Sequence, residues 1–87
     1  MSRAAHERPQ LWVTDTRFYL LCVQTNLFGD WELLKAWGGR GSRRGGHQAV
    51  QATSLPEAID MQQREARRRM RRGYRVLDEP APQPRLE

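Results

Sequence analysis

Residues 37–47 read W-G-G-R-G-S-R-R-G-G-H and hold the densest group of binding chemistry in the chain. Trp37 offers a flat aromatic surface for stacking. Arg40, Arg43 and Arg44 carry planar sets of donors that match phosphate or carboxylate oxygens. The glycines let the backbone turn tightly and approach another surface closely. The combination favours recognition of an anionic, flat-faced polymer, although it also fits a mobile hairpin loop with solvated charges.

The charge of the chain is concentrated around this stretch and the segment that follows it. The 87 residues carry a formal net charge of +5. Residues 35–75 hold 11 of the 15 basic residues but only 3 of the 10 acidic ones. A basic region of this kind is the electrostatic footprint of a polyanionic partner.

Several function classes have no support in the sequence. No paired carboxylates, nucleophile–base pair or phosphate-binding loop is present, so the chain is not expected to be an enzyme or to take a small-molecule substrate. His6 and His47 lie far apart and Cys22 has no second ligand at metal spacing, so no metal or cofactor is expected. A single cysteine fits a reducing, cytosolic setting. No apolar run approaches the roughly 18 residues of a membrane helix, so no membrane partner is expected.

The elements that must position the loop are short strands. Residues 11–14 form a short β-prone run, and residues 17–25 read as a strand buried on much of both faces. Residues 26–30 supply Asn, Gly and Asp for a turn into a strand at residues 31–38. Lys35 and Trp37 share a face there, which predicts a half-exposed surface. A weaker edge strand is expected at residues 48–53.

A helix follows the strands. Ser54 and Glu57 form a capping-box pattern, and the helix is expected to run to about Arg72 and stop at Gly73. Residues 74–77 read as a short return strand or an extended tail. The face toward the sheet is expected to hold Leu55, Ala58, Ile59, Gln62, Ala66 and Met70. The opposite, solvated face holds Arg64, Arg67, Arg68 and Arg71, with Arg69 and Arg72 on the flank.

The pattern predicts an α+β domain with a small antiparallel sheet of three to four strands and one helix packed on one face. Residues 11–77 form the domain. Residues 1–10 are expected to be a disordered lead-in, and residues 78–87, with three prolines, a disordered tail.

The order of these pieces resembles the WGR domain, which occurs in poly(ADP-ribose) polymerases and in many bacterial proteins. The resemblance covers residues 17–74, and five pieces stand in the family's order. The matching pieces are Phe18-Tyr19, Leu27-Phe28-Gly29 followed by Trp31, Trp37-Gly38-Gly39-Arg40-Gly41-Ser42, Glu57-Ala58 and Gly73-Tyr74.

One position departs from the family motif. The motif arginine falls on Gly39, and Arg40 stands where the family has an aliphatic residue. Either Arg40 supplies the guanidinium from one residue later, or the role of that arginine is lost. A one-residue step along a regular strand reverses the direction of a side chain, but the glycines around Arg40 relax that constraint.

The resemblance implies a function as well as a fold. In the polymerases the domain contacts the end of broken DNA and passes that signal to a catalytic domain, for which this chain is too short. It therefore implies a stand-alone module that binds nucleic acid, DNA rather than RNA, with weak sequence specificity, in the cytoplasm or nucleoid of a bacterium. Trp37 and Gly38 would then lie near the terminal nucleotide and Arg17 near phosphate. The alternative is an adaptor that docks an acidic protein partner through the helix or a strand edge.

Overall fold

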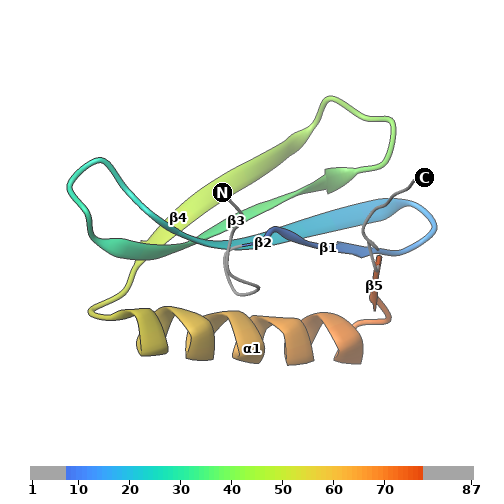
Figure 1. Cartoon of the computed structure of the whole chain (residues 1–87). Coiled ribbons are helices and arrows are strands. Elements are labelled where there is room, and N and C mark those ends of the chain that lie inside the picture. Colours follow the sequence, from blue (N-terminus) through green and yellow to red (C-terminus); the bar gives the residue numbers. More distant parts are fainter. Residues whose placement is uncertain (1–7, 78–87) are drawn as a thin grey trace, which may run out of the picture.

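A single antiparallel sheet with one helix on one face makes up residues 8–77, the part of the chain that the computed structural model describes (Figure 1). The tail expected at 78–87 and most of the lead-in expected at 1–10 lie outside those residues. The strand order is β4-β3-β2-β1-β5, and every pairing is antiparallel. The elements are β1 (Gln10–Val13), β2 (Arg17–Thr25), β3 (Trp31–Gly39), β4 (Gly45–Gln51), α1 (Leu55–Arg71) and β5 (Arg75–Val76).

The α+β class expected from the sequence is confirmed, but the sheet has five strands instead of three or four. The segment after the helix adds the fifth, because β5 pairs with β1 through Val76 and Trp12. β4 begins at Gly45, three residues before the strand expected from the sequence. Glycine has a low intrinsic strand propensity, so packing decides the structure here. A side chain at Gly46 would collide with the ring of Trp37.

A tight turn joins β2 to β3, as the sequence predicts. The side-chain Oδ1 of Asn26 accepts hydrogen bonds from the backbone N–H groups of Phe28 and Asp30. Gly29 adopts a φ of 81°, a conformation that favours glycine. The turn leaves Leu27 and Phe28 at its tip, where they are 99% and 88% exposed.

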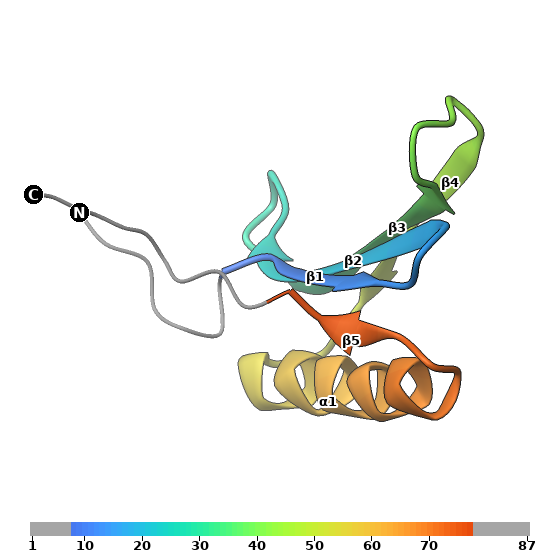
Figure 2. The same ribbon diagram turned by 90° about the vertical axis from the view of Figure 1, so that its right-hand side faces the viewer.

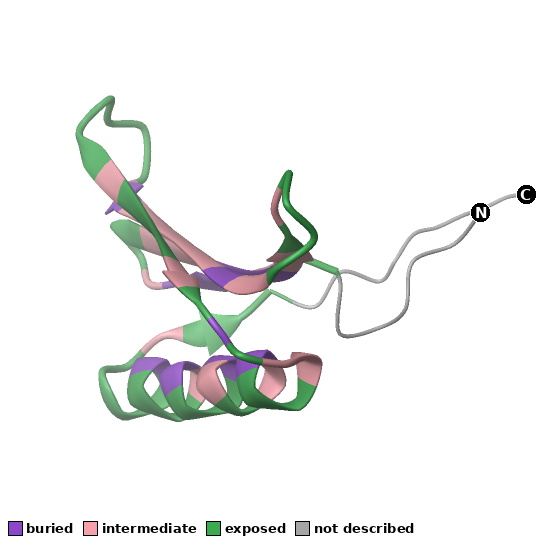
Figure 3. Ribbon diagram, turned by 90° about the vertical axis from the view of Figure 1, so that its left-hand side faces the viewer, coloured by how far each residue is buried: buried purple, intermediate pink, exposed green. Residues whose placement is uncertain are grey.

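The core lies between α1 and the sheet, and the buried positions of the helix point at the strands (Figure 3). The face that carries Lys35 and Trp37 is therefore the face that the helix covers. The sequence predicts a half-exposed surface there, but the side chain of Lys35 is only 19% exposed. Trp37 remains half-buried near the end of the sheet. The buried residues of the core cluster are Trp12, Leu21, Val23, Leu33, Ala52 and Ala58.

Ala58 and Gln62 of α1 are buried against the sheet, as predicted, but the C-terminal part of the helix differs from the prediction. Met70, expected to be in the contact, is 56% exposed, whereas Glu65 and Arg69 are 6% and 8% exposed. These two residues form an ion pair, with Arg69 Nη2 3.4 Å from Glu65 Oε2. A prediction from hydrophobicity alone places charged residues such as Glu65 and Arg69 on the solvent-exposed face, but charged residues that pair with each other can be buried.

Hydrogen bonds close the first turn of α1 in the predicted capping arrangement. Ser54 Oγ accepts a hydrogen bond from the Glu57 N–H at 3.2 Å. The Glu57 carboxylate accepts bonds from the N–H and the hydroxyl of Thr53, at 2.6 and 2.9 Å. Glu57 therefore reaches one residue beyond the N-cap and fixes the approach of the chain to the helix.

Replacing Glu57 with glutamine should remove a pH-dependent part of the stability. Hydrogen bonds from Thr53 lower the pKa of the Glu57 carboxyl below its ordinary value of 4.5. Since the folded-state pKa is depressed, this stabilisation is complete above the unfolded-state pKa and is lost as pH falls through the folded-state value. Urea unfolding followed by circular dichroism should show a difference between wild type and Glu57→Gln that closes in acid. A difference that does not vary with pH would contradict this assignment.

The last turn of α1 ends at Gly73, also as predicted. Gly73 adopts a φ of 88° and donates a hydrogen bond to the Met70 carbonyl at 3.1 Å. Tyr74 donates to the carbonyl of Arg69 at 2.9 Å. This pair of bonds is the Schellman closure of a helix, and it turns the chain back toward the sheet.

Candidate nucleic-acid interface

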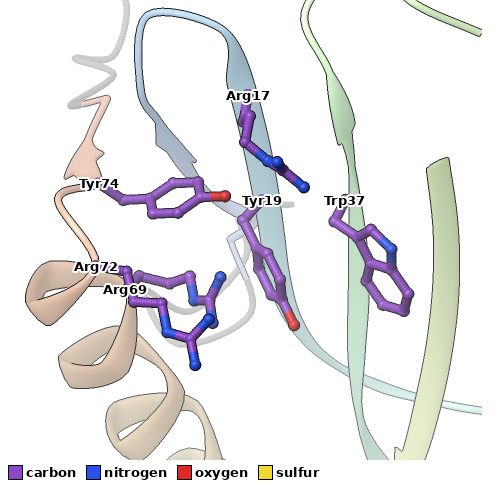
Figure 4. A pocket seen from close by; sticks show the side chains of 6 residues that line it. All are labelled: Arg17, Tyr19, Trp37, Arg69, Arg72 and Tyr74. Carbon is purple, nitrogen blue, oxygen red and sulfur yellow. The ribbon is translucent and has the colours of Figure 1, made fainter. Parts of the chain in front are cut away.

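An open pocket of about 310 Å³ lies where the last turn of α1 faces the strands β2 and β3 (Figure 4). Three arginines and three aromatic residues line it, namely Arg17, Tyr19, Trp37, Arg69, Arg72 and Tyr74. Guanidinium groups bind phosphate or carboxylate oxygens through several donors at once. Aromatic rings stack on flat ligands. The pocket therefore gathers both kinds of binding group around one opening.

Cross-strand packing fixes the orientation of Trp37. Its ring stacks on Tyr19, the residue directly opposite on β2, with ring centroids 5.8 Å apart and 21° between the ring planes. On β4 the residue opposite Trp37 is Gly46, where an added Cβ would lie 2.9 Å from the indole. The Tyr19 ring and the glycine thus orient the indole, which is half-buried and keeps part of its surface open to the pocket.

Arg69 extends this stack from the helix side. Its guanidinium carbon lies 4.1 Å from the centroid of the Tyr19 ring and 5.1 Å from that of Tyr74. Figure 4 shows Tyr19 between Trp37 and the arginines of the helix. Among the described residues, the buried Nε of Arg69 has no hydrogen-bond partner. A buried donor without a partner costs about 1–3 kcal/mol, and the cation–π contacts oppose that cost.

Glu65 balances the positive charge beneath the pocket. Its carboxylate oxygens lie 3.4 Å from Arg69 Nη2, 3.1 Å from Arg68 Nη1 and 4.0 Å from Lys35 Nζ. Within residues 8–77, Arg17 and Arg72 form no such ion pair, and both are exposed. Arg69 therefore stabilises the fold through its ion pair, whereas Arg17 and Arg72 are available to a ligand.

The Tyr19 phenol stays protonated at neutral pH. Burial, and next the negative charge of Glu65, raise the pKa of Tyr19 above its ordinary value of 10.0, while the nearby Arg69 opposes the rise. The neutral phenol adds no negative charge to the pocket. An anionic ligand therefore meets arginines and uncharged rings.

The remaining wall of the pocket depends on the chain reversal at Gly73. That reversal sets Tyr74 edge-on to Tyr19, with ring centroids 6.3 Å apart and 82° between the ring planes. Arg72 is the C-cap residue of α1, three residues after Arg69, so the two arginines lie on the same side of the helix end. Strand alternation places Arg17 and Tyr19 on the same face of β2.

The arginine-rich loop, residues 40–44, leaves the same end of the sheet but turns away from α1 (Figure 2). Arg40 is tied to the turn between β1 and β2. Its N–H donates to the Thr16 carbonyl at 2.8 Å, and its Nη1 donates to the Thr14 carbonyl at 3.0 Å. Arg43 and Arg44 are exposed. The base of the loop adjoins the pocket, because Gly39 pairs with Arg17.

The structure brings together two of the six residues predicted to bind nucleic acid, since Arg17 and Trp37 line the same pocket. Gly38 is buried in β3, and an added Cβ would lie 2.7 Å from the carbonyl oxygen of Arg44. Gly38 thus allows the loop to fold back closely on the strand. The residues outside the pocket lining are Gly38, Arg40, Arg43 and Arg44.

The sequence prediction omits the other four lining residues, Tyr19, Arg69, Arg72 and Tyr74. Tyr19 carries a readable signal, because it lies two residues from Arg17 and so shares its strand face. The helix arginines carry no such signal. Their approach to Trp37 depends on how α1 docks on the sheet, which residue spacing alone does not specify.

Two further observations concern residues 8–77. No group of three or more His, Cys, Asp or Glu side chains there is placed to hold a metal ion. No helix in that part of the chain has the length and apolar character needed to span a membrane.

The family model of the WGR domain matches residues 7–81, nearly the whole chain. The match includes α1, all five strands and every residue of the pocket. The chain therefore belongs to the WGR domain family, as its sequence resemblance indicates. The family is one of non-catalytic modules that bind nucleic acid. Comparison with curated proteins and with solved structures gives no match.

Proposed function

We propose that this chain is a non-catalytic module that binds duplex DNA, in particular DNA ends, with weak sequence specificity. The observation that supports the proposal most directly is the pocket itself. There, two stacked rings stand beside three guanidinium groups. Few ligands other than nucleic acid present flat faces and closely spaced anions together.

The pocket suggests a separate role for each kind of group. Trp37 offers a stacking surface, and stacking on a base contributes about 1–3 kcal/mol. Arg17 and Arg72 are exposed and bind phosphate oxygens. The end of a duplex exposes the face of its last base pair next to its terminal phosphates. An open pocket at the rim of the sheet therefore suits an end better than the middle of a duplex.

The loop extends this surface beyond the pocket. Arg43 and Arg44 contact backbone phosphates further along the duplex, and Arg40 holds the loop against the β1–β2 turn while adding its charge. Gly38 permits the close fold of the loop on β3. Phosphate and stacking contacts carry little information on base identity, so sequence specificity is weak. The preference for DNA over RNA rests on the family resemblance.

The test is fluorescence polarisation of the full chain with labelled blunt, nicked and single-stranded oligonucleotides at two salt concentrations. Blunt and nicked duplexes should bind more tightly than single strands. For about four phosphate contacts, affinity should fall about 150-fold between about 50 and 200 mM salt, because each contact releases counterions.

A triple variant tests the residues assigned to this function. Trp37→Ala with Arg43→Ala and Arg44→Ala should weaken binding by about 10-fold or more, since it removes one stacking surface and two phosphate contacts. Circular dichroism establishes that the variant is folded. Unchanged binding by a folded variant would refute the site, and absence of binding to every oligonucleotide would refute the function.

Leu27 and Phe28 favour a second candidate, a protein-interaction adaptor. They are almost fully exposed at the tip of the β2–β3 turn, and exposed apolar groups of this kind often mark protein contacts. The adaptor would also dock an acidic partner on the exposed helix arginines, including Arg67 and Arg71. A partner that remains bound in nuclease-treated lysate and is lost in Leu27→Ser with Phe28→Ser favours this candidate.

A further inference from the structure

The two edges of the sheet differ in a way that nucleic-acid binding leaves unexplained. At one edge, β5 is two residues long and contains Arg75. At the other edge, β4 is seven residues long and reads G-G-H-Q-A-V-Q, without Lys, Arg, Asp, Glu or Pro (Figure 1). Short strands, charges and prolines protect edges from pairing with other chains. β4 has none of these protections.

The direction of the backbone groups on β4 follows from its pairing with β3. The N–H of Ala52 donates to the Trp31 carbonyl at 2.9 Å. Alternate residues of an antiparallel strand direct both backbone groups to the same neighbour, so Gln48 and Val50 also face β3. Within residues 8–77, no strand pairs with the outer edge of β4. The residues with outward N–H and C=O groups are Gly45, His47, Ala49 and Gln51.

We propose that the outer edge of β4 pairs with the same edge of a second copy of this chain, antiparallel about a twofold axis at Gln48. In this register His47 lies opposite Ala49 of the second copy, and Gly45 lies opposite Gln51. Outward groups then meet outward groups, and about eight backbone hydrogen bonds form. The two Gln48 side chains lie opposite each other, where each amide both donates and accepts.

Charge along β4 favours a second copy over other occupants. Arg43 and Arg44 precede the strand. At its far end Gln51 donates to Asp30 at 3.2 Å, and Glu57 follows in the first turn of α1. Antiparallel pairing sets the positive end of each copy beside the negative end of the other. A peptide of a single charge sign would meet like charge at one end.

The interface places both helices on the same side of a continuous ten-stranded sheet, since the twofold axis is perpendicular to the sheet. Of the pocket residues, none belongs to β4. Dimer formation and nucleic-acid binding can therefore be tested separately.

Sedimentation velocity of the full chain, from low to high micromolar concentration, is the first measurement, and it should show a concentration-dependent dimer. Gln48→Lys and Gln48→Glu each place like charges opposite across the axis, which is destabilising. Each variant alone should weaken dimerisation by about 5-fold. An equimolar mixture of the two should restore it, because opposite charges then face each other.

Gln63 provides the matched control, because it is exposed on α1. Gln63→Lys and Gln63→Glu should dimerise as wild type does.

Ala49→Pro is the second variant. It removes an outward N–H that the monomer does not use, so it should fold and remain monomeric. A wild-type chain that is monomeric throughout would overturn the proposal. So would a dimer that persists in both Gln48 variants and in Ala49→Pro.

Discussion

Glu65→Ala should lower the free energy of unfolding by about 3 kcal/mol, a large share of the 5–15 kcal/mol typical of small domains. Glu65 is the carboxylate shared by Arg69, Arg68 and Lys35. Its loss leaves the guanidinium of Arg69, in a residue only 8% exposed, without its negative partner. Urea unfolding followed by circular dichroism measures the loss.

Asp60 offers a matched control on the same helix. Asp60 and Arg64 also form an ion pair four residues apart, with 3.0 Å between Oδ2 and Nε, but both side chains are 59% exposed. Exposed pairs of this kind contribute less than about 0.5 kcal/mol, so Asp60→Ala should be nearly neutral. Equal losses in Asp60→Ala and Glu65→Ala would show that burial does not determine the effect.

Arg17→Gln combined with Arg72→Gln should weaken binding of blunt duplex DNA by about 30-fold, equivalent to about 2 kcal/mol. Both side chains line the pocket and are exposed, so their loss removes ligand contacts while leaving the core intact. The plot of log affinity against log salt should become shallower by about 2, one for each lost phosphate contact. Fluorescence polarisation at several salt concentrations measures both quantities.

Arg67→Gln combined with Arg71→Gln makes the same change in net charge outside the pocket. Both residues are exposed on α1 and neither lines the pocket. If only long-range attraction were lost, affinity should fall by less than about 3-fold. Equal effects of the two double variants would show that general positive charge, and not the pocket, determines binding.

The strands and the helix could largely be predicted because their signals are local. A continuous run of aromatic and aliphatic residues predicts Arg17–Thr25 as a strand, and Ser54, Glu57 and Gly73 mark the two ends of the helix. β5 was harder to predict, because its two residues, Arg75 and Val76, gain their conformation by pairing with β1. β4 starts earlier than its residue types indicate, because a glycine at position 46 is what the neighbouring indole requires.

Hydrophobicity predicts the face of the helix only in part. The pattern places Ala58 on the sheet, as the structure does, but it also places Met70 there, which the structure leaves exposed while it buries Glu65. The reason is that Glu65 and Arg69 neutralise each other, and that Arg69 also stacks on Tyr19. The contact with Tyr19 joins residues far apart in the sequence, so the spacing of residues along the helix does not reveal it.

The candidate site likewise combines residues that local signals predict with residues that only tertiary packing brings together. Arg17 and Trp37 could be proposed because β2 and β3 are neighbours along the chain and carry recognisable motif residues. Arg72 and Tyr74 lie more than 30 residues beyond Trp37, and only the packing of α1 brings them to the strands. A loop rich in arginine suggests a single continuous binding stretch, whereas the pocket is assembled from separate segments.

Because the pocket joins Arg17 near the start of the domain to Tyr74 near its end, it exists only after the intervening chain has folded. A nascent chain still on the ribosome would therefore have no such site until the residue at position 74 had emerged. Once the domain has folded, a ligand that binds only the folded state should raise the free energy of unfolding. The increase is about 2.7 kcal/mol when the ligand concentration is 100 times the Kd. Occupancy would thus protect the whole domain against proteolysis by reducing the population of unfolded chains.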